Sequence, residues 1–268
     1  MIQVLAYLGA RSGGEITLGG EPVPVRLNAA ALDRLRQLIV LRDLFGVLNP
    51  HYLVEYLLKR PIFNYCIQTQ EPILELIVKT VETVELSPYR DFMGKYPNEL
   101  SRGQRQRVVI VRALVTQPEV ILADGPTSML DVFIRMSILD LLEKLQAERH
   151  LSYLFITHDL ASTRYISDHL LVMYAGHAVE GGETGEVVQH PLHPYTQLLL
   201  SAVPRPGRPD PIGVIASSAE PPNLSTGCQG CVFQSRCPLA MARCTTEIPQ
   251  AQEVGSDHWM ACHAISSA

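Results

Sequence analysis

The feature that most constrains the fold is a strand, a helix and a strand in immediate succession. EVILAD (119–124) is a short, continuously apolar run, as expected of a strand buried on both faces. VFIRMSILDLLEKLQAER (132–149) spaces apolar residues along one helical face, and LSYLFITHD (151–159) predicts a second buried strand. A connection of this kind is right-handed and makes the two strands parallel. The sequence therefore predicts an α/β fold with Asp124 and His158 at the carboxyl ends of neighbouring strands, where open sheets place ligands.

A capped helix precedes the first of these strands. In ELSRGQRQRVVIVRALVTQP, Ser101 is a predicted N-cap, Gln104 completes a capping box three residues later, and Pro118 marks the end. The hydroxyl, the unpaired N–H groups and the helix dipole at such an N-terminus favour an anion. The alternative is that Ser101 and Gln104 only cap the helix.

The regions before and after these elements differ in their sequence patterns. YLVEYLLK and PILELIVKTVETVEL, between residues 51 and 100, put apolar residues three and four apart and predict helices. After Leu200, VPRPGRPDP predicts a Pro-rich linker, followed by a Cys-rich tail. The organisation predicted is one large domain with an appendage.

Composition excludes some classes of protein. The 268 residues are 47% hydrophobic, enough for a buried core, and the net charge of −5 gives no basic stripe for nucleic acid. No run approaches the roughly 18 apolar residues needed to cross a bilayer, and the start lacks the basic region of a signal peptide. We expect a cytosolic chain whose membrane contact is made through other subunits.

The cysteines are concentrated in the tail, where five of the six lie in the last 41 residues. Without an export signal, clustered thiols are more often metal ligands than disulfides. Four thiolates can hold Zn²⁺ or an iron–sulfur cubane. Cys228 and Cys231 form a C-x₂-C pair, which is typical of zinc sites, so zinc stays an alternative to the cluster. Thiols without a metal in a poorly ordered tail are the third alternative.

Several motifs, taken together, identify a family resemblance. LSRGQRQR, VILADGPTSMLD and LFITHDL, at these separations, resemble the signature motif, the Walker B strand with D-loop, and the switch histidine of an ABC ATPase. HPLHPYTQLLLSAVP, CVFQSRCPLAMARC and a final ACH are similar to the C-terminal extension of ATP-binding subunits of oligopeptide and dipeptide importers. The resemblance covers nearly the whole chain, including GVLNP at 46–50.

The resemblance implies a fold class and a domain division. Residues 1–203 would form an ABC-type nucleotide-binding domain, with the parallel sheet of P-loop NTPases but without its N-terminal strands. A helical subdomain would occupy about 50–105. Residues 204–268 would form the Cys-rich extension.

The resemblance also implies cofactors and site residues. The cofactors would be ATP, Mg²⁺ and a [4Fe-4S] cluster, with Zn²⁺ as the alternative to the cluster. Asp124 would hold Mg²⁺, His158 would sense the γ-phosphate as the catalytic residue, and Asp131 would act across a dimer interface. The remaining residues are those of the signature motif, facing ATP held by the opposite subunit, and the cluster ligands: Ser101, Arg102, Gly103, Gln104, Cys231, Cys237, Cys244 and Cys262.

Departures from the family pattern concern the chain's own ATP site. The phosphate loop, G-x-x-x-x-G-K-[ST], is absent from the sequence, and Met1 aligns just downstream of where it would end. Arg42 takes the place of the Q-loop glutamine, Arg102 that of a signature glycine, and Gly125 that of the catalytic glutamate. Glycine cannot accept a proton, and losing a positioned base costs about 10²- to 10⁴-fold in rate. We expect no ATP hydrolysis at this site.

The resulting prediction is an ATP-binding subunit of a peptide importer that lends its signature motif and D-loop to a paralogous ATPase subunit. Its other partners would be transmembrane permease subunits and an extracytoplasmic peptide-binding protein, at the cytoplasmic face of the membrane and without nucleic acid. Two alternatives stay open. One is a nonfunctional fragment of a decayed or misannotated gene, and the other is a soluble ABC protein outside transport.

Overall fold

The computed structural model describes residues 13–23, 38–42 (backbone only), 48–65, 67, 71–127, 130–202 and 229–264. The chain divides into two compact units, Met1–His158 and Asp159–Ala268. The sequence-based boundary between residues 203 and 204, like the linker that follows it, lies outside the described residues. It stays a prediction.

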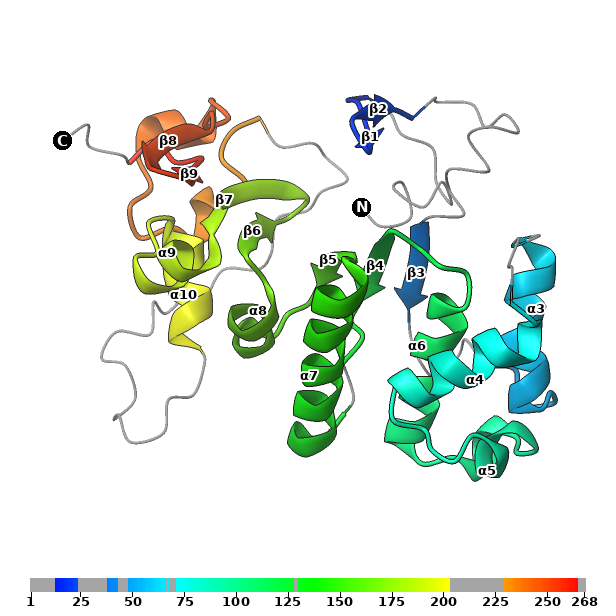
Figure 1. Cartoon of the computed structure of the whole chain (residues 1–268). Helices are drawn as coiled ribbons and strands as arrows, with labels where there is room; N and C mark the ends of the chain where they lie inside the picture. The colour runs from blue at the N-terminus through cyan, green and yellow to red at the C-terminus, as the bar shows by residue number, and fades with distance from the viewer. Residues whose placement is uncertain are drawn as a thin grey trace. The chain divides into compact units, whose positions relative to one another are not determined.

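A parallel sheet forms the centre of the first unit (Figure 1). Its strands are β3 (Leu38–Arg42), β4 (Val120–Asp124) and β5 (Ser152–Ile156), in the order β3-β4-β5. Helix α7 (Val132–Arg149) connects β4 to β5, whose pairing is parallel. The strand–helix–strand prediction is therefore confirmed.

Strand β5 is less buried than its sequence predicts. Ser152 is exposed and residues 153–156 are partly exposed, so the prediction of a strand buried on both faces is wrong here. The reason is topological, because β5 is an outer strand of the sheet as described, with β4 on its inner side. In contrast, the middle of β4 is fully buried between its two neighbours.

Helices fill the region where the sequence pattern predicts them. They are α3 (Val54–Asn64), α4 (Ile73–Thr83), α5 (Arg90–Met93), the 3₁₀ turn η1 (Pro97–Glu99) and α6 (Arg102–Leu114). A short hairpin of β1 (Thr17–Leu18) and β2 (Glu21–Pro22) precedes them in the chain. The core of the unit comes from one face of α7 and from α6 and β4, with Val109, Ile110, Leu114, Ile121, Ile138, Leu139 and Leu142 buried.

The second unit contains an antiparallel sheet in the order β6-β7-β9-β8. Strands β6 (His169–Tyr174) and β7 (His177–Glu183) form a hairpin whose two turn residues, Ala175 and Gly176, both have positive φ, which suits the twist of a two-residue loop. The tail supplies β8 (Gln252–Gly255) and β9 (His258–Met260), and β9 pairs with β7. Helices α8 (Leu160–Ile166), α9 (Thr184–Gln189) and α10 (Pro194–Ser201) and the 3₁₀ turns η3 (Gln234–Arg236) and η4 (Ala242–Thr245) complete it.

The tail shares an apolar core with the β6–β7 hairpin. Phe233 is fully buried and lies edge-on to Tyr174 of β6, with ring centroids 5.2 Å apart. Buried residues of the hairpin, of α9 and of the tail complete the cluster: Val172, Val179, Val187, Cys231, Val232 and Cys244. Residues 229–264 of the tail are thus held by packing and by strand pairing with β7.

Among the described residues, no helix is both long enough and apolar enough to cross a membrane.

Candidate functional site

The start of α6 is capped as its sequence predicts. The Ser101 hydroxyl accepts a hydrogen bond from the Gln104 N–H (3.2 Å), and the Gln104 side chain accepts one from the Ser101 N–H (3.0 Å). Ser101 and Arg102 are exposed, so this helix N-terminus opens to solvent. A hydroxyl that accepts one bond can still donate its own proton. The arrangement can bind an anion at the positive end of the helix dipole.

The start of α7 lies directly beside the start of α6. Asp131 caps α7 by accepting a hydrogen bond from the Ile134 N–H at 3.0 Å. A Cβ added to Gly103 would lie 3.4 Å from Cγ2 of Ile134, within ordinary van der Waals contact, so the two helix ends are close neighbours. The helix start that carries Ser101, Gly103 and Gln104 therefore lies beside the helix start that Asp131 caps.

A buried hydrogen bond ties α6 to the turn that follows β4. The Gln106 side-chain nitrogen donates to the Pro126 carbonyl at 2.7 Å, and Gln106 is 1% exposed. Within the described part of the chain its other side-chain atom, Oε1, has no hydrogen-bond partner. The single bond couples the position of the capped helix to the segment leading toward Asp131.

The carboxyl ends of the three parallel strands meet at one edge of the sheet. Arg42 of β3 is the register partner of Asp124, and Asp124 is the partner of Ile156 in β5. His158 follows Ile156 by two residues and is exposed. The predicted placement of Asp124 and His158 at the ends of neighbouring strands is confirmed, whereas their chemical roles stay predictions.

Gly125 has a backbone conformation that favours glycine. Its φ is +61°, in the left-handed region, and its N–H donates to the Ile156 carbonyl at 2.8 Å. A side chain here would raise the conformational energy by about 1–2 kcal/mol. The position therefore lacks a proton-accepting group and has a conformation unfavourable to one.

The iron–sulfur prediction is wrong. Throughout the part of the chain that the structure describes, no group of three or more His, Cys, Asp or Glu side chains is placed to hold a metal ion, and this applies equally to the zinc alternative. The four cysteines of the predicted cluster form no disulfide with one another in the described part of the chain: Cys231, Cys237, Cys244 and Cys262. Cys66 and Cys228 lie outside the described residues.

Packing explains why these thiols gather without a metal. Cys231 and Cys244 are buried in the tail core, and the Cys231 N–H donates to the Cys244 carbonyl at 2.8 Å. Burial raises the pKa of the Cys237 and Cys262 thiols, and neighbouring cysteines raise both further. Cys231 and Cys244 therefore contribute to the apolar core of the tail.

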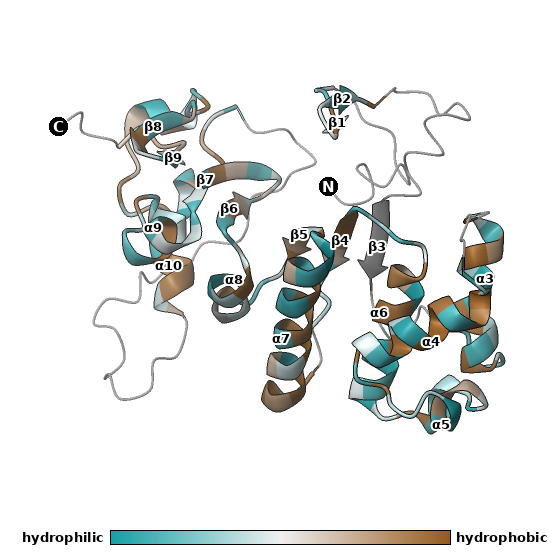
Figure 2. Ribbon diagram, viewed as in Figure 1, coloured by the Kyte–Doolittle hydropathy of each residue, from teal (hydrophilic) through white to brown (hydrophobic). Residues whose placement is uncertain are grey.

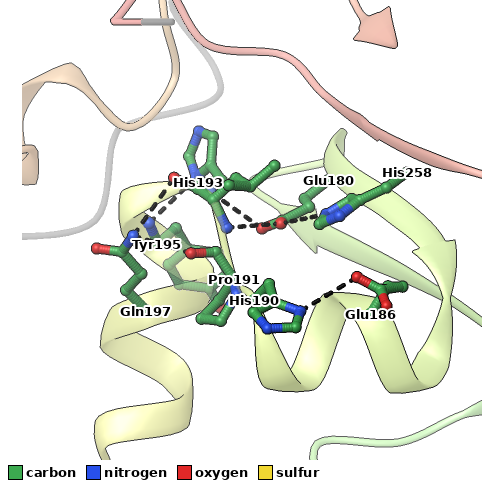
Figure 3. A network of polar contacts seen from close by, with 9 residues as sticks. Glu180, Glu186, His190, Pro191, His193, Tyr195, Gln197 and His258 are labelled. Atoms are coloured by element: carbon green, nitrogen blue, oxygen red, sulfur yellow. Dashed lines mark hydrogen bonds and ion pairs between the residues drawn. The ribbon is translucent and has the colours of Figure 1, made fainter. Parts of the chain in front are cut away.

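Sequence reasoning missed a buried polar network centred on Glu180 (Figure 3). The Glu180 side chain is fully buried in β7 and accepts hydrogen bonds from the N–H groups of Leu192 (2.8 Å) and His193 (3.1 Å). It also lies 2.8 Å from Nε2 of His258 in β9. One carboxylate thus joins β7, the loop before α10 and the tail strand.

His193 in this network is held neutral. Burial lowers its pKa to about 4, with the Glu180 charge acting in the opposite direction. Its Nδ1 accepts a hydrogen bond from the Tyr195 N–H at 3.1 Å and so caps α10. A signal was present in the sequence, because the repeated His-Pro of HPLHP places His193 immediately before a proline at the first helical position.

Two sequence families match this chain. Residues 1–128 match the family described as ABC transporter. Residues 179–244 match the family described as oligopeptide/dipeptide transporter, C-terminal region, which spans β7 and much of the tail core.

Three curated relatives illustrate the similarity. The oligopeptide transport ATP-binding protein AppF of Bacillus subtilis is 41% identical over 236 residues, which are 85% of this chain and 69% of AppF. A putative peptide import ATP-binding protein of Brucella ovis is 39% identical over 260 residues, 94% of this chain and 79% of the relative. The di/tripeptide transport ATP-binding protein DppF of Pseudomonas aeruginosa is 35% identical over 98% of this chain and 81% of DppF.

Solved structures share the fold. The ATP-binding cassette MJ0796, solved as a dimer, aligns with a TM-score of 0.58 and 24% identity over 68% of this chain and 78% of that one. CbiO1 from Clostridium perfringens, part of an ABC transporter complex, aligns with a TM-score of 0.60 and 23% identity. The alignment covers 70% of this chain and 73% of CbiO1. At these identities the likeness shows the fold alone, and that fold is the predicted α/β cassette.

Proposed function

This chain belongs to the ATP-binding proteins of the oligopeptide and dipeptide class of ABC transporters, and we propose that it completes the ATP site of a paralogous ATPase subunit in a peptide importer. The observation that carries the proposal is the contact between the starts of α6 and α7. It presents Ser101, Gly103 and Gln104 of the signature motif beside Asp131 of the D-loop. The chain serves as an ATP-binding subunit through these residues.

The site at the end of β4 does not fit hydrolysis. Gly125 has no proton acceptor and has a left-handed backbone conformation. Asp124 offers a carboxylate of the kind that binds Mg²⁺, and His158 offers an exposed imidazole. Both roles would require the phosphates of a bound nucleotide. No hydrolytic step is therefore assigned to this site.

The start of α6 fits the γ-phosphate of a nucleotide held by another subunit. The Ser101 hydroxyl can donate to a phosphate oxygen, and such a bond to a charged group contributes about 1.5–3 kcal/mol. The helix dipole and the exposed Arg102 add positive potential at the same place. ATP and Mg²⁺ would come with a paralogous subunit that carries an intact phosphate loop, so the working unit is a heterodimer.

The importer supplies the remaining partners. Exposed aromatic residues at the start of α3, Tyr52 and Tyr56, stack with ring centroids 4.5 Å apart and are 45% and 40% exposed. Such a surface suits contact with another protein, and we assign it to the transmembrane permease subunits. The complex would lie at the cytoplasmic face of the membrane and receive peptides from an extracytoplasmic binding protein.

Mixing experiments test the proposal. The partner is the importer ATPase subunit of the same organism that carries an intact G-x-x-x-x-G-K-[ST] loop. Adding this chain should raise the steady-state ATPase rate above that of the partner alone, and Ser101→Arg should abolish the increase. A mixture no faster than the partner alone would contradict the proposal and favour the decayed-fragment alternative.

A further inference from the structure

One arginine of α6 is largely buried and joins this helix to two others. Figure 2 shows a hydrophilic start and a more hydrophobic remainder of α6, and Arg107 is the last residue of the polar run RGQRQR. The Arg107 side chain is 14% exposed. A cation in such a place needs hydrogen-bond partners that replace water. These partners show which parts of the fold Arg107 holds together.

The guanidinium group of Arg107 donates from two different nitrogens to two other helices. Nη1 donates to the carbonyl of Val84, the C-cap residue of α4, and to the carboxylate of Glu85 at 2.8 Å. Nη2 donates to the Ser137 hydroxyl of α7 at 2.7 Å. The last carbonyls of a helix have no partner within the helix, so the cation caps α4. One planar group thus fixes α6 relative to both α4 and α7.

The bond to Ser137 continues the contact between the starts of α6 and α7. Gly103 and Ile134 are the close neighbours at the two helix starts. Arg107 follows Gly103 by four residues, and Ser137 follows Ile134 by three, so each pair lies on one face of its helix. The bond therefore joins the same two helix faces about one turn further in. Two successive contacts set how α6 lies against α7.

We propose that Arg107 is a positioning residue for the ATP site that this chain completes. It sets the spacing between α6, which begins after Ser101, and α7, which begins after Asp131. This inference rests on the proposed function. The planar arginine group carries donors in fixed, divergent directions, so it can bond α4 and α7 at once. Loss of these bonds would displace Ser101 from the partner's nucleotide, and a misplacement of about 1 Å can lower a rate by about 10²-fold.

The alternative is that Arg107 only stabilises the fold. A less stable variant supplies fewer folded molecules, so adding more of it restores the full rate of the partner's ATPase. A folded variant with a misplaced α6 stimulates less per molecule, so its maximal rate stays low at saturation. The plateau of a titration therefore distinguishes positioning from stability.

Titration of the intact paralogous subunit with the full chain tests the inference. Arg107→Gln should lower the plateau of the stimulated ATPase rate at least about fivefold. The ATP concentration that gives half the maximal rate should stay the same, because the partner holds the nucleotide. Ser137→Ala removes only the acceptor on α7 and should lower the plateau about two- to threefold. Adding it to Arg107→Gln should cause little further decrease, since the two residues share one contact.

Arg149→Gln is the matched control. Nη2 of Arg149 also links α7 to α4, by donating to the Thr83 hydroxyl at 3.4 Å. Arg149 is the last residue of α7, at the opposite end of the helix from Asp131. The control therefore removes a link between the same two helices away from the ATP site, and the plateau should be unchanged.

The outcomes separate the inference from the proposed function. If the wild-type chain does not stimulate the partner, the proposed function fails. If the wild type stimulates and both Arg107→Gln and Ser137→Ala reach its plateau, even at higher concentration, the inference is overturned and the proposed function stands. An equal loss in Arg149→Gln also overturns it, because any link to α4 would then have the same effect. If Arg107→Gln does not fold, Ser137→Ala decides alone, since it keeps the guanidinium group and its bonds to α4.

Discussion

Glu180 and His258 lie 78 positions apart in the sequence, yet Oε1 of Glu180 and Nε2 of His258 are 2.8 Å apart in a buried pair between β7 and β9. Two backbone N–H groups converge on the same carboxylate, at 2.8 and 3.1 Å. The pair fixes the tail strand to the preceding sheet.

Glu180→Gln should destabilise the second unit by about 2–4 kcal/mol, because an amide replaces one acceptor oxygen by a donor and leaves a buried donor unpaired. Hydrogen exchange of residues 252–262 should become faster, and the urea midpoint should fall. Glu183→Gln, on the same strand but exposed, should change neither measurement. Wild-type exchange in Glu180→Gln would show that the carboxylate does not hold β9.

His193 should make the second unit less stable in acid. Its folded pKa, about 4, is below the usual 6.5, so the unfolded chain binds the proton first as pH falls. This contribution is complete above the unfolded pKa and is lost between about pH 7 and pH 4, by about 3 kcal/mol in total. His193→Asn, which keeps a capping acceptor without titrating, should flatten this dependence in urea unfolding at pH 7, 5.5 and 4.5. Equal slopes in the two proteins would refute the assignment.

Substitution of Gly125 should lower stability and should not create an ATPase. At φ +61°, alanine or glutamate should cost about 1–2 kcal/mol, and asparagine less. Gly94→Ala is the control, because Gly94 has a φ of −84° and open space around its Cβ position. Thermal unfolding measures the cost, and a phosphate-release assay should show no ATPase activity in purified Gly125→Glu. Hydrolysis by that variant alone would contradict the assignment of the chain's own site as inactive.

Gln106→Leu should separate stability from function. It removes the hydrogen bond to the Pro126 carbonyl but also the buried Oε1, which has no partner among the described residues. The two effects offset, so the free energy of unfolding should change by no more than about 1 kcal/mol. Stimulation of the partner's ATPase should nevertheless fall severalfold, since α6 loses its link to the turn before Asp131. Full stimulation by a stable Gln106→Leu would show that this link has no functional role.

Local patterns were sufficient to predict the elements of the first unit. The apolar run of β4, the capping residue Ser101 and the apolar face of α7 are local signals, and the structure follows each of them. The burial of β5 was mispredicted because it depends on how many strands flank it, which its own sequence does not encode.

The polar network and the state of the tail thiols could not be predicted in the same way. Glu180 meets His258 through the pairing of β7 with β9, which joins segments far apart in the sequence. Neither the hydrophobic periodicity of a segment nor its composition indicates which distant segment it pairs with. The cysteine spacing suggested a metal, but the tail instead packs Phe233 against Tyr174 and so does not depend on one for its core. Apolar packing and metal binding can gather the same residues, and the spacing alone does not distinguish them.

The position of β9 between β7 and β8 has a consequence for synthesis of the protein. A ribosome that has finished β7 at Glu183 must still add 75 residues to reach His258, which takes about 4–15 s at 5–20 residues per second. During that interval the edge of β7 that will pair with β9 is unpaired, and the apolar residues of the β6–β7 hairpin are not yet covered by the tail. Chaperones that bind nascent polypeptides would therefore have a defined window in which to protect it, and a transcript broken before codon 258 would yield a product that quality-control proteases can recognise.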